Sequence, residues 1–412
     1  MSARTHYGLV VLGLIVLAVF GSLGLARFGY TSILPAMQDS LKLSNSQTGE
    51  LQTWNLVGYL LTVVFAGVLA TRYGARVVIP VALAVTGSAL VLTGLIPTFG
   101  GARLGRFLAG VGGAGGNVPA MALVSAWFDA RRRGLATGAG VGGSSLGLMV
   151  TGPLIPVVLG RYGVEGWRVC WYVLGAMAFV IALLCALFLR NRPEELGLSP
   201  VGTIETGAPR PEGSARVSPL NWSLVYRSGV LWHLAGVYFA FGFSYIIYST
   251  FFIRYLVKEG SFTATAAGLL WLKIGLISGI SGFLWGSLSD RWGRRLALVG
   301  VFGLQGVSFL VFGWSRELPM VYLSAGLFAL TAWSIPALMA ALCGDLFGAR
   351  LAPAALGLVT IVFGLGQALG PYLAGRLADL TQSFASAFVV AGFVALLGAG
   401  GSLLLPRKTG PA

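Results

Sequence analysis

Apolar runs of roughly 20 residues, separated by short polar turns, occupy most of this chain. A helix of that length spans the hydrocarbon core of a bilayer. Inside lipid every backbone polar group must find a partner in the protein, and a helix satisfies its own. Only 10% of the residues are charged, against about 25% in soluble domains. The sequence therefore predicts a polytopic, all-α membrane protein.

Twelve of these runs are predicted to be transmembrane helices. Their expected bounds are 8–36, 47–70, 77–97, 100–127, 134–159, 167–190, 229–256, 263–287, 296–314, 318–343, 352–376 and 384–405. The segment between the sixth and seventh runs is rich in Pro, Gly, Ser and charge, which is typical of a linker. We expect an N-terminal six-helix bundle at 1–190, a cytoplasmic linker at 191–228 and a C-terminal six-helix bundle at 229–412.

A charged turn occurs twice, half a chain length apart. One copy is Gly286–Arg295 and the weaker copy is Gly67–Arg76, so the offset in numbering is 286 − 67 = 219. The segments Phe128–Arg131 and Phe347–Arg350 share this offset. Matches that keep one order and one offset indicate an internal duplication, as in many transporters.

The basic residues mark one end of the predicted bundle. With the N-terminus inside, 17 of the 28 Lys and Arg fall in cytoplasmic segments, eight in outer segments or span ends, and three within spans. Cytoplasmic loops are enriched in Lys and Arg. We therefore expect both termini in the cytoplasm, with the protein in the bacterial inner membrane. The net charge of +15 is explained by this topology and does not indicate nucleic-acid binding.

The charged turn resembles a signature of the major facilitator superfamily, G-x-L-x-D-R-x-G-R-R. The second copy matches every motif position, whereas the first carries Thr71 at the acidic one. The segment Arg106–Gly112 is similar to the fourth-span motif of the same superfamily. The resemblance implies two pseudo-symmetric six-helix bundles around a central cavity, which opens to each side of the membrane in turn.

Shorter motifs resemble narrower groups of transporters. The segment Arg192–Gly197 is similar to one in bacterial oxalate/formate and monocarboxylate transporters, and Arg27–Tyr30 resembles bacterial permeases with mostly unassigned substrates. Gly152-Pro153 lacks the glycine pair that follows in drug-export antiporters. The resemblance thus implies carboxylate transport and makes drug export less favoured.

Charged side chains at mid-membrane depth are rare and mark functional sites. Arg27 lies near the middle of the first predicted span. Lys273 lies about ten residues into the eighth, roughly 15 Å deep at 1.5 Å per residue. None of the 13 Asp and Glu residues is expected at that depth. Two cations without a carboxylate give the cavity a positive potential, so an anionic substrate would supply the missing charge.

The duplication adds candidates at the same depth. An offset of 219 relates Lys273 to Trp54, and one near 221 relates Arg27 to Tyr248. These four residues are predicted to converge. Further residues expected to line the cavity are Asn117, Tyr245, Trp333, Ser334 and Gln367. The alternatives are that Arg27 fixes a kink, that Lys273 reaches the outer surface by snorkelling, and that the aromatic residues only pack.

The charged turns are predicted to control the conformational change. Asp290 can pair with an Arg of its own turn or with the N-terminal end of a neighbouring helix, and such contacts hold one end closed in one state. The alternative is a role in topology alone. The expected gating residues are Asp290, Arg291, Arg294, Arg295, Arg72, Arg76 and Arg106. Arg106 also fits a purely structural role.

The predicted function is secondary active transport of a small organic anion, preferentially a monocarboxylate, by alternating access. The expected partners are this substrate and the lipid bilayer, with protons as an open choice of coupling ion and a functional monomer. We expect no cofactor, metal or enzymatic activity, because the three cysteines are scattered and no nucleophile–base pair shares a depth. The alternative is proton-coupled efflux of amphipathic compounds, which needs a titrating carboxylate in the cavity. A signalling receptor would need an added cytoplasmic domain.

Overall fold

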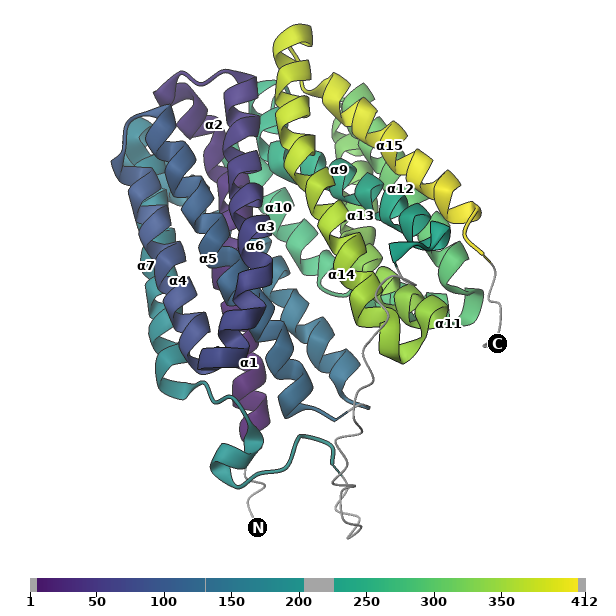
Figure 1. The fold of residues 1–412 in the computed structure, drawn as a ribbon. Coiled ribbons are helices and arrows are strands. Elements are labelled where there is room, and N and C mark those ends of the chain that lie inside the picture. Colours follow the sequence, from purple (N-terminus) through teal and green to yellow (C-terminus); the bar gives the residue numbers. More distant parts are fainter. Residues whose placement is uncertain (1–5, 130, 204–225, 407–412) are drawn as a thin grey trace.

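The computed structural model describes residues 6–129, 131–203 and 226–406, and these are almost wholly helical (Figure 1). Within them, eleven helical stretches are long and apolar enough to cross a membrane. The longest, Arg133–Phe188, holds two crossings, because Gly163 adopts a φ of 64° and ends the first of them. The predicted twelve transmembrane helices are thus confirmed.

The first six crossings are formed by α1 (Tyr7–Val19) with η1 (Phe20–Phe28) and α2 (Gly29–Leu41), α3 (Asn45–Tyr73), α4 (Ala75–Leu95), α5 (Phe99–Trp127), α6 (Arg133–Tyr162) and α7 (Gly166–Phe188). The last six are formed by α9 (Gly229–Lys258), α10 (Ala264–Ser278) with α11 (Ser281–Trp292), α12 (Arg294–Trp314), α13 (Leu318–Thr331), α14 (Ser334–Thr381) and α15 (Ala385–Leu403). Helix α14 changes direction at Gly348, whose φ is 70°: its first part completes the crossing that α13 begins (Leu318–Gly348), and its second part forms the next crossing (Leu351–Thr381).

The two sets of helices pack as two groups, which Figure 1 shows on the left and on the right. They meet along three helix pairs, α3 with α14, α6 with α10, and α2 with α9. We call the end of the bundle with the charged turns (71–75 and 290–294) the turn end, and the opposite end (42–44, 259–263 and 382–384) the far end. The domain boundaries stay a prediction, because 204–225 in the expected linker lies outside the described residues.

The duplication is visible in the backbone of the turns. Gly74 and Gly293, which the same offset relates, have φ/ψ of 82°/148° and 87°/150°, a region that glycine enters without steric cost. Ser44 and Thr263, related in the same way, begin α3 and α10, and each side chain accepts a hydrogen bond from a backbone N–H three residues later. The two halves therefore turn equivalent corners in the same way.

The first crossing departs from a regular α-helix. Its middle section, η1, is a π-helix, a form that is rare and concentrated at functional sites. Here η1 lies directly against α6. A Cβ placed on Gly24 would come within 2.9 Å of the Gly147 Cα atom, so only glycine permits this approach. Arg27 belongs to this irregular, closely packed section.

Candidate functional site

Arg27 lies buried at the boundary between the two groups of helices, with 7% of its surface exposed. Its guanidinium carbon is 4.9 Å from the centre of the Tyr59 ring on α3. Its charge also acts on the Tyr245 phenol of α9, in the other half. Across the described residues no carboxylate forms a salt bridge with Arg27, and its Nε atom has no hydrogen-bond partner. This buried cation is therefore left without a counter-charge.

Polar side chains from both halves surround Arg27. The Asn117 amide of α5 donates a 2.9 Å hydrogen bond to the Tyr59 hydroxyl. From the second half, the Gln367 amide of α14 donates to the Tyr245 hydroxyl. The structure thus groups four of the candidate residues, Arg27, Asn117, Tyr245 and Gln367, at this boundary. These groups offer hydroxyls and amides that can turn towards a bound molecule.

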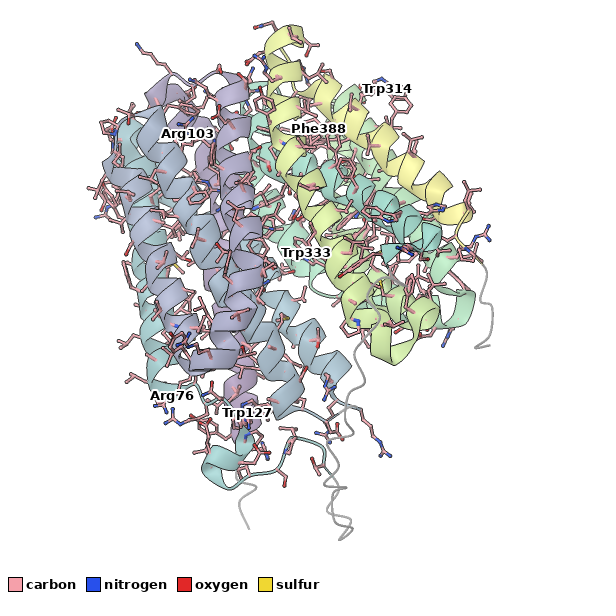
Figure 2. The ribbon with its side chains drawn as sticks, in the orientation of Figure 1. Arg76, Arg103, Trp127, Trp314, Trp333 and Phe388 are labelled. Carbon is pink, nitrogen blue, oxygen red and sulfur yellow. The ribbon has the colours of Figure 1, made fainter. Side chains whose placement is uncertain are left out.

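An aromatic contact closes one side of this cluster. The Trp333 ring lies 5.5 Å from Phe28 and 6.4 Å from Tyr245, measured between ring centres. Its indole N–H donates a 2.9 Å hydrogen bond to the Ser145 hydroxyl of α6. Figure 2 shows Trp333 near the middle of the bundle, between the two groups of helices. Trp333 therefore joins the two halves through its contacts with Ser145 and Phe28.

Tyr59 and Ser145 are site residues that the sequence analysis missed. A signal for Tyr59 exists in the polar residues Gln52, Asn55 and Tyr59, which recur at the spacing of one helix face. For Ser145 the glycine-rich run around it gave no comparable pattern. Its hydroxyl also lies 3.0 Å from that of Ser278 on α10, so it links α6 to the second half.

Lys273 does not belong to this cluster, and its predicted convergence with Arg27 is wrong. Its side chain is exposed on α10, on the face that carries Leu276 and Ile277, which are 53% and 38% exposed. Such an apolar exposed face is the one that meets lipid. The Nζ atom lies 5.3 Å from the centre of the Tyr322 ring. A long lysine stem allows its amine to leave the lipid core, as in the snorkelling alternative.

Trp54 and Tyr248 also lie elsewhere. The Trp54 indole donates a 3.1 Å hydrogen bond to Glu50 near the far end. The Tyr248 hydroxyl is 2.8 Å from that of Ser324, and its ring packs among phenylalanines inside the second half. The predicted convergence of Trp54 and Tyr248 with Arg27 is wrong. The internal repeat relates residues at equal depth in the membrane, but it does not determine which side of the helix each residue faces.

Ser334 does not line the cluster around Arg27 either. It is fully buried, and its hydroxyl donates a hydrogen bond to the Ser281 carbonyl.

Arg106 is a second buried cation behind Arg27. It is 0% exposed, and its guanidinium donates to the Ala26 carbonyl in η1 and, at 2.7 Å, to the Gln52 amide oxygen. Its charge acts on Arg27 through space. The Tyr30 ring lies 4.6 Å from the guanidinium carbon. Arg106 therefore fastens the π-helix that carries Arg27, far from both charged turns.

Each charged turn makes its contacts within its own half, as far as the described residues extend. Asp290 pairs with Arg294 at 2.7 Å, and Arg294 also lies 3.6 Å from Asp345. Asp290 thus takes the first of its two predicted partners, an Arg of its own turn. In the first copy the Asn191 side chain accepts a 2.9 Å hydrogen bond from the Arg76 backbone. The guanidinium of Arg72 lies over the Tyr73 ring. The remaining basic residues of the two turns are Arg291 and Arg295.

Polar contacts between the halves gather at the far end. The Asp379 carboxylate at the end of α14 accepts two 2.9 Å hydrogen bonds, from the backbone N–H groups of Asn45 and Ser46. These groups form the N-terminal end of α3, which favours negative charge. Arg254 of α9 donates to the Asn45 side chain at 2.9 Å. Two further pairs across the same boundary are Arg254 with Gln38 and Lys258 with Asp39.

Solved structures share this fold. The chain matches a bacterial homologue of the human lysosomal transporter Spinster, in an inward-facing and occupied conformation, with a TM-score of 0.77 and 18% identity over 98% of each chain. It matches the nucleoside transporter NupG with a TM-score of 0.73 and 12% identity, over 96% of this chain and 100% of that one. At these identities the likeness concerns the fold alone.

Sequence relatives span nearly the whole chain. A probable sulfoacetate transporter, SauU of Cupriavidus necator, is 26% identical over 97% of this chain and 94% of its own length. The hexuronate transporter of Bacillus subtilis is 24% identical over 90% and 88%. The model of the family described as "Uncharacterised MFS-type transporter YbfB" matches residues 16–403. The chain therefore belongs to this family of the major facilitator superfamily, and is a multi-pass membrane transporter rather than an enzyme.

Proposed function

We propose that this protein is a secondary transporter of a small organic anion, preferentially a monocarboxylate, that binds at Arg27. The observation that carries the proposal is the buried Arg27 guanidinium between the halves, with which no carboxylate of the described residues forms a salt bridge. A buried charge without a counter-charge is unfavourable, so a substrate that brings the opposite charge is stabilised there. Relatives named as sulfoacetate, hexuronate and monocarboxylate transporters support an anionic substrate.

The proposed binding mode uses Arg27 for charge and its neighbours for hydrogen bonds. A guanidinium binds a carboxylate through two parallel N–H···O bonds. The hydroxyls of Tyr59 and Tyr245 are held by the amides of Asn117 and Gln367, so both halves can contact one substrate. Arg106, in place of Lys273, supplies the second positive charge near the site. It acts through space and stays bonded to the backbone of η1.

The proposed transport cycle follows from where the halves touch. The far end is held by Asp379, Arg254 and Lys258, while the turn end has its ion pair within the second half. We propose that the far end faces outwards across the bacterial inner membrane and that both termini are cytoplasmic, as the Arg distribution favours. In this conformation the substrate would exchange with the cytoplasm, and the charged turns would form the opposite gate.

The electrostatics of the site bear on proton coupling. Arginine stays protonated throughout the physiological range, and the described residues place no Asp or Glu in a salt bridge with Arg27. The proposed site therefore binds the substrate as an anion, and a coupled proton would travel on the substrate itself. Proton-coupled efflux of amphipathic compounds, which uses a titrating carboxylate, has no support from these residues.

A ligand screen with matched variants tests the proposal. Purified protein is heated with small carboxylates, sulfonates and the corresponding neutral amides, because a ligand that binds the folded state raises its melting temperature. We expect at least one monoanion, and none of the amides, to stabilise the protein. Arg27→Gln should abolish both this shift and uptake into proteoliposomes, whereas Lys273→Gln should retain both. Normal anion uptake by Arg27→Gln would refute the site.

A further inference from the structure

Two of the helix pairs that join the halves contain close glycine contacts. In the first pair, α3 with α14, a Cβ on Gly49 near the far end would lie 2.0 Å from the Pro371 carbonyl oxygen. Further along, a Cβ on Gly364 would lie 2.2 Å from the Leu60 Cδ2 atom. Residue numbers rise along α3 and fall along α14 between these contacts, so the helices are antiparallel. Leu60 follows Tyr59, and the contact therefore reaches the level of the proposed anion site.

The second pair, α6 with α10, repeats this arrangement. A Cβ on Gly268 would lie 2.1 Å from the Gly152 carbonyl oxygen, and one on Gly275 would lie 2.9 Å from the Ser145 carbonyl oxygen. These two contacts are seven residues apart on both helices, again in opposite directions. Ser145 also accepts the hydrogen bond from the Trp333 indole, so this pair likewise stays in contact as far as the anion site.

Towards the turn end the first pair separates, although its sequence continues in the same register. Seven residues, about two helical turns, past Leu60 and Gly364 lie Gly67 and Gly357. This spacing places both on the helix faces that make the contacts nearer the far end. A Cβ placed on either glycine would meet no atom within 4 Å. Two small residues in register are thus left without a contact.

The second pair separates in the same way. Seven residues past Ser145 and Gly275 lie Gly138 of α6 and Gly282 of α11, which continues α10 after a short break. A Cβ on Gly138 would meet no atom within 4 Å, and one on Gly282 would meet only the Trp333 carbonyl oxygen of its own half, at 3.6 Å. The same spacing therefore gives a second pair of glycines that are in register and out of contact.

A glycine inside a helix is less favourable than an alanine unless something else requires it. In membrane proteins small residues recur where two helices approach closely. This explains the glycines near the far end but not, in this conformation, those near the turn end. We propose that Gly67 packs against Gly357, and Gly138 against Gly282, in the opposite conformation, in which the turn end is closed. The inference rests on the proposed transport cycle and names the surfaces that form its second gate.

Disulfide trapping tests the first contact in the full chain, reconstituted in proteoliposomes. The paired substitutions Gly67→Cys and Gly357→Cys should crosslink under mild oxidation, because a disulfide needs Cα atoms within about 7 Å of each other. The matched control pairs Gly357→Cys with Leu69→Cys, which lies about half a turn further round α3. We expect the control pair to react at least tenfold more slowly. The three native cysteines are buried and do not compete.

A further variant tests whether the two helix pairs close together. Gly138→Leu adds a bulky side chain where this structure has open space, so the variant should fold but hold the turn end apart. It should slow crosslinking of the 67–357 pair at least tenfold. Gly303→Leu, at an equally open place on α12, should change the rate less than twofold.

Three results would overturn the inference: absence of crosslinking in the 67–357 pair, an equal rate in the control pair, or an undiminished rate in Gly138→Leu. The reaction needs no transported anion. Failure of every anion to bind would therefore defeat the proposed function without changing the crosslinking result.

Discussion

Neutralising Asp379 should loosen the far end of this transporter. Its carboxylate oxygens each accept a 2.9 Å hydrogen bond from a backbone N–H, one from Asn45 and one from Ser46. Hydrogen bonds to charged groups contribute about 1.5–3 kcal/mol each, and a charge at a helix N-terminus adds about 0.3–1 kcal/mol. In Asp379→Asn the amide can accept only one of the two bonds and carries no charge. Because Asp379 is half-buried, solvent screens part of this loss. We expect the substitution to reduce the free energy that favours the closed far end over the open one by about 1–2 kcal/mol.

The measurement is the distance across the far end. Val164 in the first half and Leu318 in the second are 77% and 55% exposed, and can be replaced by spin-labelled cysteines. The three native cysteines are buried and do not interfere. Each loss of about 1.4 kcal/mol is a tenfold change in an equilibrium constant. The ratio of far-end-open to far-end-closed distances should therefore rise about five- to thirtyfold in Asp379→Asn.

A matched control separates this contact from a general effect of charge. Glu317 is exposed at the same end, and its side chain has no polar contact with the first half among the described residues. Glu317→Gln should leave the distance ratio within twofold of the native value. An unchanged ratio in Asp379→Asn, or an equal shift in both variants, would show that the helix cap does not hold the far end closed.

Single contacts give three further predictions. Arg106→Gln should raise the KM for the transported anion about tenfold, because about 1.4 kcal/mol of favourable potential is lost, and an unchanged KM in an uptake assay would contradict this. Lys273→Ala should change uptake less than twofold, since the side chain faces lipid. Gly74→Ala and Gly293→Ala should both lower the melting temperature, because a positive φ combined with a ψ near 150° costs a residue with a Cβ about 1–3 kcal/mol. The drop should be larger for Gly74, where the Cβ would lie 2.8 Å from Asn191, than for Gly293, which has open space.

The internal repeat predicted some features of the structure and misplaced others. It located equivalent turns, since Gly74 and Gly293 adopt nearly equal backbone angles. It misplaced Tyr248 and Trp54, because an offset in sequence fixes depth along a helix more closely than direction around it. Half a turn, about two residues, is enough to move a side chain from the centre of the bundle to its outside.

The helix face of Lys273 was nevertheless encoded in its neighbours. Gly268 and Gly275 pack against α6, where an added Cβ would come within 2.1 Å and 2.8 Å of other atoms. At 3.6 residues per turn, Lys273 points away from both glycines. Small residues mark the packed side of a membrane helix. The spacing of the glycines therefore indicates that Lys273 lies on the opposite, lipid-facing side of α10, which its charge alone does not reveal.

The sequence by itself determined the twelve crossings and their bounds to within a few residues. It could do so because the length of an apolar run and the polar turn that ends it are local properties, fixed by lipid. Only the tertiary structure decided which cations share the core. Arg27 reaches the boundary through a π-helix held by Arg106, and this irregular turn is stabilised by contacts from other helices rather than by its own residues.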